Sequence, residues 1–397
     1  LSLAFALTGC GTISRSPDGI VRLVDSRLAP AADPRIRASD SERLEVLADE
    51  LVGHLDASDP TAILALSGGG ANGAYGAGVL VGWSDSGNRP TFGVVTGVST
   101  GALAAPFAFL GSDWDDELQS AYTDGQTQRL LSWRSFAAFF APSVFSPGDL
   151  RDLVEDHVTA DLLIAIAREH AKGRRLLVAT TDLDAQETII WDMGMVATQG
   201  GPQGLTLFQD ILIASASIPG VFPPVLIAGL DDEGRVVQTM HVDGGVNTPF
   251  LGIPEGLMNW TPGPRAGRGP FYVIVNGQIA RSRSVTPGRL RDILGRSYDS
   301  MSKATLRTQL AATAEFANRS HMPLLVAAIP AGVDASSLDF DAESMRALFD
   351  LGRTAAATGE VWKRFSDPSL AGVSDQPAVE AAPIETAPSQ GEPVTLP

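Results

Sequence analysis

Ser99 stands between two glycines in the segment VVTGVSTGALAAPF, which covers residues 94–107. Gly97, Ser99 and Gly101 fit the pattern G-x-S-x-G, with an expected strand before the serine and an expected helix of small residues after it. A serine at such a sharp turn exposes its hydroxyl at the amino end of the helix, where backbone N–H groups stabilise negative charge. The pattern therefore predicts a nucleophilic serine.

A second glycine-rich segment, ALSGGGANGAYGAG, covers residues 65–78. Gly68, Gly70 and Gly73 match the dinucleotide pattern G-x-G-x-x-G, but that interpretation needs an acidic residue at the end of the next strand. Here the next strand ends in the Ser99 turn instead. We therefore interpret the amides of Gly68, Gly69 and Gly70 as an oxyanion hole, in which one donor contributes about 3 kcal/mol to stabilising the transition state.

The general base is sought among five histidines and the acidic residues. Only His321 lies late enough for the order Ser, Asp, His of a hydrolase triad. His241 is expected to be a partly buried strand residue. Asp243 follows the alternating segment VVQTMHV and precedes Gly244 and Gly245. Its carboxylate can serve as the base if burial keeps it basic enough, although a hairpin turn also explains the Asp-Gly pair.

Apolar strand-like segments alternate with helical ones from residue 60 onward, which predicts an α/β domain with a mostly parallel central sheet. Turn residues at 182–187 and 231–234 predict two antiparallel hairpins, and a helix is expected over 286–318. We expect four regions: a signal remnant at 1–10, a tether with a short helix at 11–59, the hydrolase domain at 60–367, and a disordered tail at 368–397.

Composition narrows the possible partners. The chain has 397 residues, of which 44% are hydrophobic and 19% charged, and its formal charge of −17 argues against nucleic acid. The tail holds six prolines, four acidic residues and no Lys, Arg or aromatic residue, so it has little apolar surface to bury.

The cysteine at position 10 follows an apolar run ending in Leu7, Thr8 and Gly9. This segment resembles the lipobox of bacterial lipoproteins, which predicts lipidation of Cys10, a lipid anchor in the membrane and a place in the cell envelope. Gly11, where inner-membrane lipoproteins carry aspartate, favours the outer membrane or the periplasmic face. The alternatives are an ordinary secretory peptide and a buried strand with an incidental cysteine.

Taken together, the three motifs resemble the patatin-like phospholipases. The ordered blocks are Gly68 to Gly73, Gly97 to Gly101, and Asp243 to Gly245, with a fourth block, ASASIPGVFPPV, at 214–225. The resemblance implies a three-layer α/β/α fold and a serine acyl hydrolase of the lipase or phospholipase A type. It also implies that Ser99 and Asp243 form a dyad without histidine and without a cofactor, which forms an acyl-enzyme.

The remaining residues of the blocks are expected to support the motifs: Asn72, Gly73, Gly97, Gly101, Gly244 and Gly245. Many family members carry Arg or Lys where this chain has Asn72, so a phospholipid headgroup is less strongly implied than an acyl ester. Phospholipids, lysophospholipids, neutral esters and thioesters are all candidate substrates.

Three further possibilities are open. The aromatic segment 130–147 is either a cap over an acyl-chain groove or a core helix. Asp182 with Asp184, and the acidic run 231–233, are expected to shape turns rather than bind metal. The rival functions are a histidine-dependent esterase using His321 and a catalytically silent envelope lipoprotein with a binding role.

Overall fold

The computed structural model describes residues 33–54, 62–124, 147–230, 236–261, 269–283, 285–366, 370 and 373–375. The strands are β1 (Arg35–Arg37), β2 (Ala62–Leu66), β3 (Phe92–Val98), β4 (Arg175–Asp182), β5 (Glu187–Asp192), β6 (Val225–Leu230), β7 (Val236–Asp243), β8 (Phe271–Val275), β9 (Arg281–Arg283), β10 (Leu324–Ala328), β11 (Lys363–Arg364) and β12 (Val373–Asp375). The helices are α1 (Ser41–His54), α2 (Gly73–Asp85), α3 (Thr100–Leu110), α4 (Asp115–Thr123), α5 (Pro147–His157), α6 (Ala160–Ala171), α7 (Met193–Gln199), α8 (Gly201–Ala216), α9 (Leu290–Arg319) and α10 (Ala342–Ala357).

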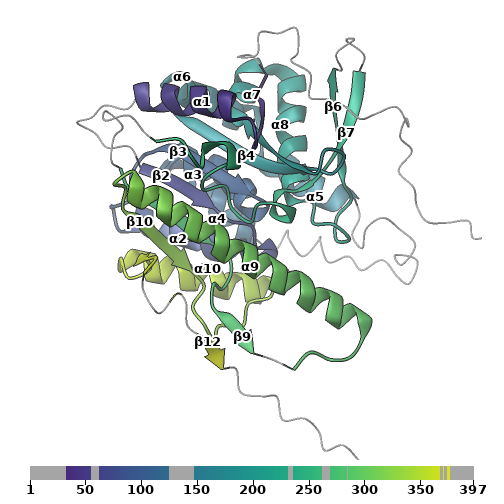
Figure 1. Ribbon diagram of the computed structural model, residues 1–397, viewed down its shortest axis with the longest axis vertical. Coiled ribbons are helices and arrows are strands. Elements are labelled where there is room, and N and C mark those ends of the chain that lie inside the picture. Colours follow the sequence, from purple (N-terminus) through teal and green to yellow (C-terminus); the bar gives the residue numbers. More distant parts are fainter. Residues whose placement is uncertain are drawn as a thin grey trace, which may run out of the picture.

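A mixed sheet runs through the molecule in the order β1, β5, β4, β3, β2, β8, β10, β11 (Figure 1). Its five central strands, from β4 to β10, pair in parallel, whereas β1, β5 and β11 pair antiparallel at the edges. Strands β6 and β7 form an antiparallel hairpin that joins the sheet through β4. The α/β class, the mostly parallel sheet and the antiparallel hairpins are confirmed.

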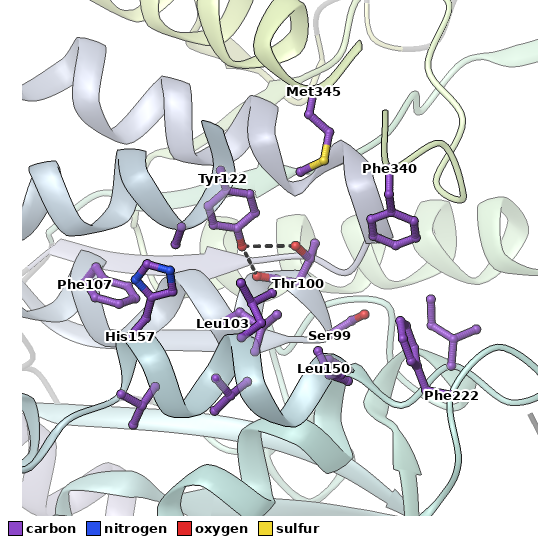
Figure 2. A pocket seen from close by; sticks show the side chains of 17 residues that line it. Ser99, Thr100, Leu103, Phe107, Tyr122, Leu150, His157, Phe222, Phe340 and Met345 are labelled. Carbon is purple, nitrogen blue, oxygen red and sulfur yellow. Dashed lines mark hydrogen bonds between the residues drawn. The ribbon is translucent and has the colours of Figure 1, made fainter. Parts of the chain in front are cut away.

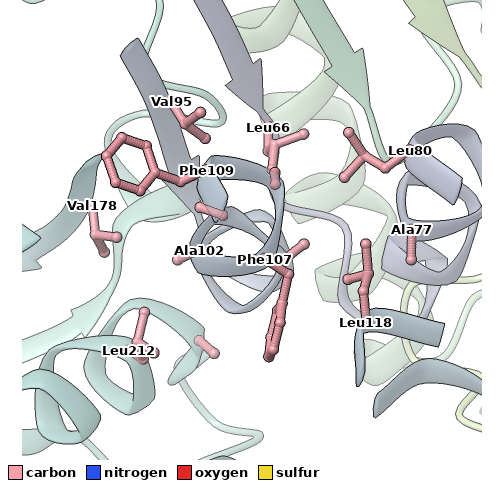
Figure 3. Close-up of a cluster of buried hydrophobic side chains, with 14 of the residues drawn as sticks. Leu66, Ala77, Leu80, Val95, Ala102, Phe107, Phe109, Leu118, Val178 and Leu212 are labelled. Atoms are coloured by element: carbon pink, nitrogen blue, oxygen red, sulfur yellow. The ribbon is translucent and has the colours of Figure 1, made fainter. Parts of the chain in front are cut away.

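Alternating side chains of β2 divide the core into two halves, as expected for a strand buried on both faces. Leu64 and Leu66 face one cluster, which packs against α2, α3 and α8, and Figure 3 draws part of it. Ile63 and Ala65 face the opposite side, where α1 and α9 supply the covering apolar residues. Helices therefore lie on both faces, and the predicted three-layer arrangement is confirmed.

The sheet begins earlier in the chain than the expected domain start at residue 60. Residues 35–37, placed in the expected tether, form β1 and pair antiparallel with residues 189–191 of β5. Ile36 is buried there, and Leu44 of α1 is buried against the same face. A three-residue strand among prolines carries too short a pattern for its side-chain alternation to be recognised in the sequence.

The expected disordered tail also contains an ordered piece. Residues 373–375 form β12, which pairs in parallel with β9. Strand pairing uses backbone groups, so the polar composition of the tail does not prevent it. No helix in the described part of the chain combines the length and apolar character needed to span a bilayer.

Candidate active site

Ser99 and Asp243 are brought together by the register of β4 with two neighbours. Val98, the last residue of β3, lies opposite Ala179 of β4. The next residue of β4, Thr180, lies opposite Asp243 of β7. Beyond the end of β3, strand β7 therefore pairs with β4 in its place. The two side chains meet at that junction, where Ser99 Oγ donates a hydrogen bond of 2.6 Å to Asp243 Oδ2.

The backbone of Ser99 is strained in the way the sequence pattern predicts. Its φ of 56° and ψ of −129° lie in a region that residues with a side chain rarely adopt, at the junction of β3 and α3. Gly97 and Gly101 permit this turn, because a Cβ at either position would lie within 3.0 Å of neighbouring backbone. Ser99 is buried. The predicted strand-to-helix serine turn is therefore present.

Asp243 is a buried carboxyl group with a raised pKa. Burial raises its pKa to about 7, while the hydrogen bonds from Ser99 and from the Gly245 amide act in the opposite direction. The Gly245 amide donates to Oδ1 over 2.7 Å, which leaves Oδ2 directed at Ser99. A carboxylate with a pKa near neutrality, held against a hydroxyl, is a competent general base.

The glycine-rich segment lies beside the serine, but only part of the predicted oxyanion hole can act as one. A Cβ on Gly68 would lie 3.1 Å from Ser99 Cβ. The amide of Gly68, however, donates to Pro249 O over 2.9 Å, so the prediction that Gly68 is an oxyanion donor is wrong. Among the residues that the structure describes, the amides of Gly69 and Gly70 make no such hydrogen bond.

Thr100 supplies a further candidate donor that sequence reasoning did not name. It is the first residue of α3, and within the described chain its amide has no hydrogen-bond acceptor, as is usual in the first turn of a helix. Tyr122 fixes this residue by donating to Thr100 O over 2.8 Å. The G-x-S-x-G motif could have indicated Thr100, because the residue after the nucleophile commonly contributes to the oxyanion hole.

The fourth block, residues 214–225, does pack against the site. Ser215 Oγ accepts a hydrogen bond of 3.0 Å from the Ser99 amide and donates one of 2.7 Å to Ala179 O. The carbonyl of Ser217 accepts from the Asp243 amide over 2.9 Å. Both halves of the dyad are therefore held by the end of α8, and Ser215 in particular was not singled out by the sequence.

The other motif residues have structural roles. A Cβ at Gly73, Gly244 or Gly245 would lie within 3.0 Å of neighbouring atoms, so these positions admit no side chain without a shift. Asn72 is buried in the short 3₁₀ turn Gly70–Asn72. Its side-chain oxygen has no hydrogen-bond partner within the described ranges.

The histidines weighed as bases lie elsewhere. His241 is fully buried, and its two ring nitrogens lie 3.0 and 2.8 Å from the hydroxyls of Thr180 and Thr239. Burial lowers its pKa to about 4, so the ring is neutral. His321 sits in an exposed turn after α9 with a φ of 57°. The described bonds of Ser99 Oγ lead to Asp243 and to neither histidine.

An apolar pocket opens at Ser99. Its wall includes Leu103 and Phe107 of α3 together with residues of α5 and the start of α10. Figure 2 shows His157 beside Phe107 at one end of this pocket, Ser99 farther along it, and Phe222 and Phe340 beyond Ser99. Burial lowers the pKa of His157, which favours the neutral ring in the pocket wall.

Some predictions fall outside the described residues or concern turns. Cys10, most of the aromatic segment 130–147 and the acidic run 231–233 lie outside the described ranges. Asp182 Oδ1 accepts hydrogen bonds from the amides of Asp184 and Ala185, which is the turn-shaping role expected for it.

The family model described as Patatin-like phospholipase matches residues 64–252. Among solved structures, VipD from Legionella pneumophila is similar with a TM-score of 0.36 and 13% identity, over 78% of this chain and 68% of VipD. The type III effector protein ExoU is similar with a TM-score of 0.26 and 14% identity, over 75% of this chain and 52% of ExoU. No curated protein is matched.

Proposed function

Because the chain belongs to the patatin-like phospholipase family, we propose that it is a serine hydrolase that cleaves lipid acyl esters with a Ser99–Asp243 dyad. The observation that carries this proposal is the 2.6 Å hydrogen bond from Ser99 Oγ to Asp243 Oδ2, at a strained turn beside a glycine-rich loop. This pair supplies a nucleophile and a base without a histidine.

In the acylation step, Ser99 Oγ attacks the ester carbonyl carbon while Asp243 takes the hydroxyl proton. The carbonyl oxygen becomes an oxyanion, and the amides of Gly69, Gly70 and Thr100 are the donors placed to stabilise it. When the intermediate collapses, the bond to the alcohol breaks and Asp243 returns its proton to the leaving oxygen. The products of this step are the free alcohol and an acyl group bound to Ser99.

Deacylation repeats these movements with water. Asp243 takes a proton from a water molecule, whose oxygen attacks the acyl carbon. Collapse of the second tetrahedral intermediate breaks the bond to Ser99 Oγ, and Asp243 returns the proton to that oxygen. The fatty acid leaves and the dyad is restored, so the cycle needs no cofactor.

The substrate proposal rests on the pocket beside Ser99. Its walls are mostly aliphatic and aromatic side chains, which suit an acyl chain better than a polar or charged group. Asn72, at the position where many family members carry Arg or Lys, brings no charge to the neighbouring loop. Support is therefore stronger for the acyl chain than for a phosphate headgroup.

The testing experiment measures hydrolysis of a panel of phospholipids, lysophospholipids, neutral esters and thioesters by the full chain. We expect Ser99→Ala and Asp243→Asn each to lose activity by about a thousandfold or more, as seen when members of a catalytic unit are removed. A fluorophosphonate probe is expected to label Ser99 in the unchanged protein.

Alanine at each of the five histidines serves as the control series. The dyad predicts that no folded histidine variant loses activity to the extent of Ser99→Ala, whereas such a loss in His321→Ala alone would favour a histidine-dependent esterase. Folded protein that neither reacts with the probe nor hydrolyses the panel would favour a binding role instead.

We further propose that Cys10 carries a lipid anchor and places the enzyme in the bacterial envelope. The support is the segment Leu7 to Cys10 alone. Metabolic labelling with a fatty acid in a bacterial host tests this, because label should appear in the unchanged chain and be absent from Cys10→Ala.

A further inference from the structure

One face of helix α9 exposes a row of large apolar side chains. One further member, Val285, precedes the helix by five residues. Its members and their exposed fractions are Val285 (90%), Leu290 (73%), Ile293 (46%), Leu294 (60%), Tyr298 (48%) and Met301 (67%). Their spacing of three or four residues within α9 puts them on one side of the helix. An exposed apolar row of this length usually marks an interaction surface.

The row faces away from the protein core. Leu306, Leu310 and Ala317, in the second half of α9, are buried against the sheet. At about 100° per residue, these three positions lie roughly opposite Leu290, Leu294 and Met301. In Figure 1 the helix runs across the sheet and its first half extends past it. The exposed row is therefore separate from the hydrophobic core, which the opposite face of α9 covers.

The sequence around the row is basic in an acidic protein. Residues 281–307 hold seven Lys or Arg and two acidic residues, in a chain whose net charge is −17. Arg281 and Arg289 are exposed. Asp299 lies 3.3 Å from both Arg296 and Lys303, so it offsets part of that charge. An apolar helix face that begins beside the exposed Arg289, within a basic segment of the chain, suits an anionic lipid surface.

Tyr298 of this row interacts electrostatically with the dyad. Burial and, to a lesser extent, the negative charge of Asp243 raise the pKa of Tyr298 to about 12. We propose that the first half of α9, with residues 285–289 before it, is a docking surface for a membrane that contains anionic lipids. Docking there would hold the enzyme at the surface that contains its proposed lipid substrate.

Vesicle flotation tests this surface with the full chain carrying Cys10→Ala in every sample, so that no lipid anchor contributes. The vesicles contain about three parts phosphatidylcholine to one part phosphatidylglycerol. We expect Leu290→Ser/Leu294→Ser to bind at least about tenfold more weakly than the parent, because it removes two apolar contacts with the lipid. The matched control is Val46→Ser/Ile164→Ser, which changes two similarly exposed residues on α1 and α6 and should bind like the parent.

Further samples test separately whether vesicle binding depends on charge and whether it depends on catalysis. Arg289→Glu should weaken binding to the anionic vesicles, added salt should weaken binding of the parent, and pure phosphatidylcholine should bind less. Ser99→Ala should bind as well as the parent, since docking does not need the proposed hydrolysis. If the esterase tests fail while vesicles still bind, the proposed hydrolysis is wrong and the surface stands.

Two results would overturn the surface. One is equal flotation of the parent and Leu290→Ser/Leu294→Ser, when circular dichroism finds both folded. The other is a parent that does not float but forms a dimer that the same variant loses, which would identify a second copy of the chain as the partner of this face.

Discussion

Asp243 must be ionised to take a proton from Ser99, yet burial favours its neutral form. Its pKa of about 7 predicts that kcat/KM rises as the pH increases through 7 and levels off above it. At pH 5 we expect roughly a hundredfold lower kcat/KM than at the plateau, since one proton is gained. The measurement is a pH profile from 5 to 9 with an uncharged soluble ester. A flat profile, with the protein folded throughout, would remove Asp243 as the base.

The same carboxyl affects stability, with a sign that follows from its raised pKa. Below the ordinary pKa of 3.8 the group is protonated in both states, but above 7 the folded protein must hold a buried carboxylate. A rise from 3.8 to about 7 corresponds to about 4 kcal/mol at most. Asp243→Asn is therefore expected to raise the unfolding temperature at pH 8 and to have little effect near pH 4. An equal shift at both values would contradict this.

Ser215 is a positioning residue, because it touches the Ser99 backbone rather than the reacting atoms. Ser215→Ala leaves the buried Ser99 amide without its partner, and we expect kcat to fall by about tenfold with little change in KM. The matched control is Ser217→Ala, whose hydroxyl donates to Ile213 O of α8 and, among the described residues, to no group of the site. Fluorophosphonate labelling should slow in the first variant and not in the second. Equal rates in both would assign Ser215 a purely structural role.

Local patterns predict the serine turn but not its partners. Gly97, Ser99 and Gly101 are adjacent in sequence, so the strain at Ser99 follows from a five-residue motif. Ser215 lies 116 residues away, and its bond depends on where α8 ends relative to β3. The sequence also could not exclude Gly68 as an oxyanion donor, because only the folded chain shows that the Gly68 amide donates to Pro249 O.

At the scale of elements, helices α2 and α10 approach so closely that glycine is required between them. A Cβ at Gly78 would meet the carbonyl oxygen of Phe349 in α10, and Gly82 has the same relation to Arg353. Gly78→Ala is expected to destabilise the protein by about 1 to 3 kcal/mol through overpacking. Thermal unfolding measures this loss.

Gly295→Ala is the control, because nothing lies within 4 Å of a Cβ at this exposed position in α9. Alanine has a higher helix propensity than glycine, so this variant should be equal to or more stable than the parent. If both substitutions had the same effect, close approach of the two helices would not explain Gly78.

Elements were predictable where their patterns are long. The hairpins around 182–187 and 231–234, strand β8 and helix α9 follow from alternation, turn residues and helical spacing in the sequence. The short strands β1 and β12 do not, since three residues carry almost no periodic signal and both depend on a partner strand far away in the chain. The pairing of Ser99 with Asp243 was inferred from the family resemblance, whereas the register of β3 and β7 against β4 follows only from the folded chain.

The folded domain includes residues that lie before position 60. Strand β1 extends the sheet at β5, and α1 covers Val94 and Leu177 on one face of it. Leu44 and Ile36 are buried there, and each fully buried side chain of this kind contributes about 2 kcal/mol. A chain that starts at residue 60 would lose these contacts and expose the apolar face beneath them.

We therefore compare two shortened chains, one starting at residue 33 and one at residue 60, both ending at residue 375. The first keeps β1 and α1, so its unfolding temperature should match that of the full chain. The second should unfold at a markedly lower temperature or aggregate, because an apolar patch on a sheet face favours association. Equal unfolding temperatures would mean that β1 and α1 add nothing to the domain. Hydrolysis by the chain from residue 33 would in addition locate the whole catalytic apparatus within residues 33–375.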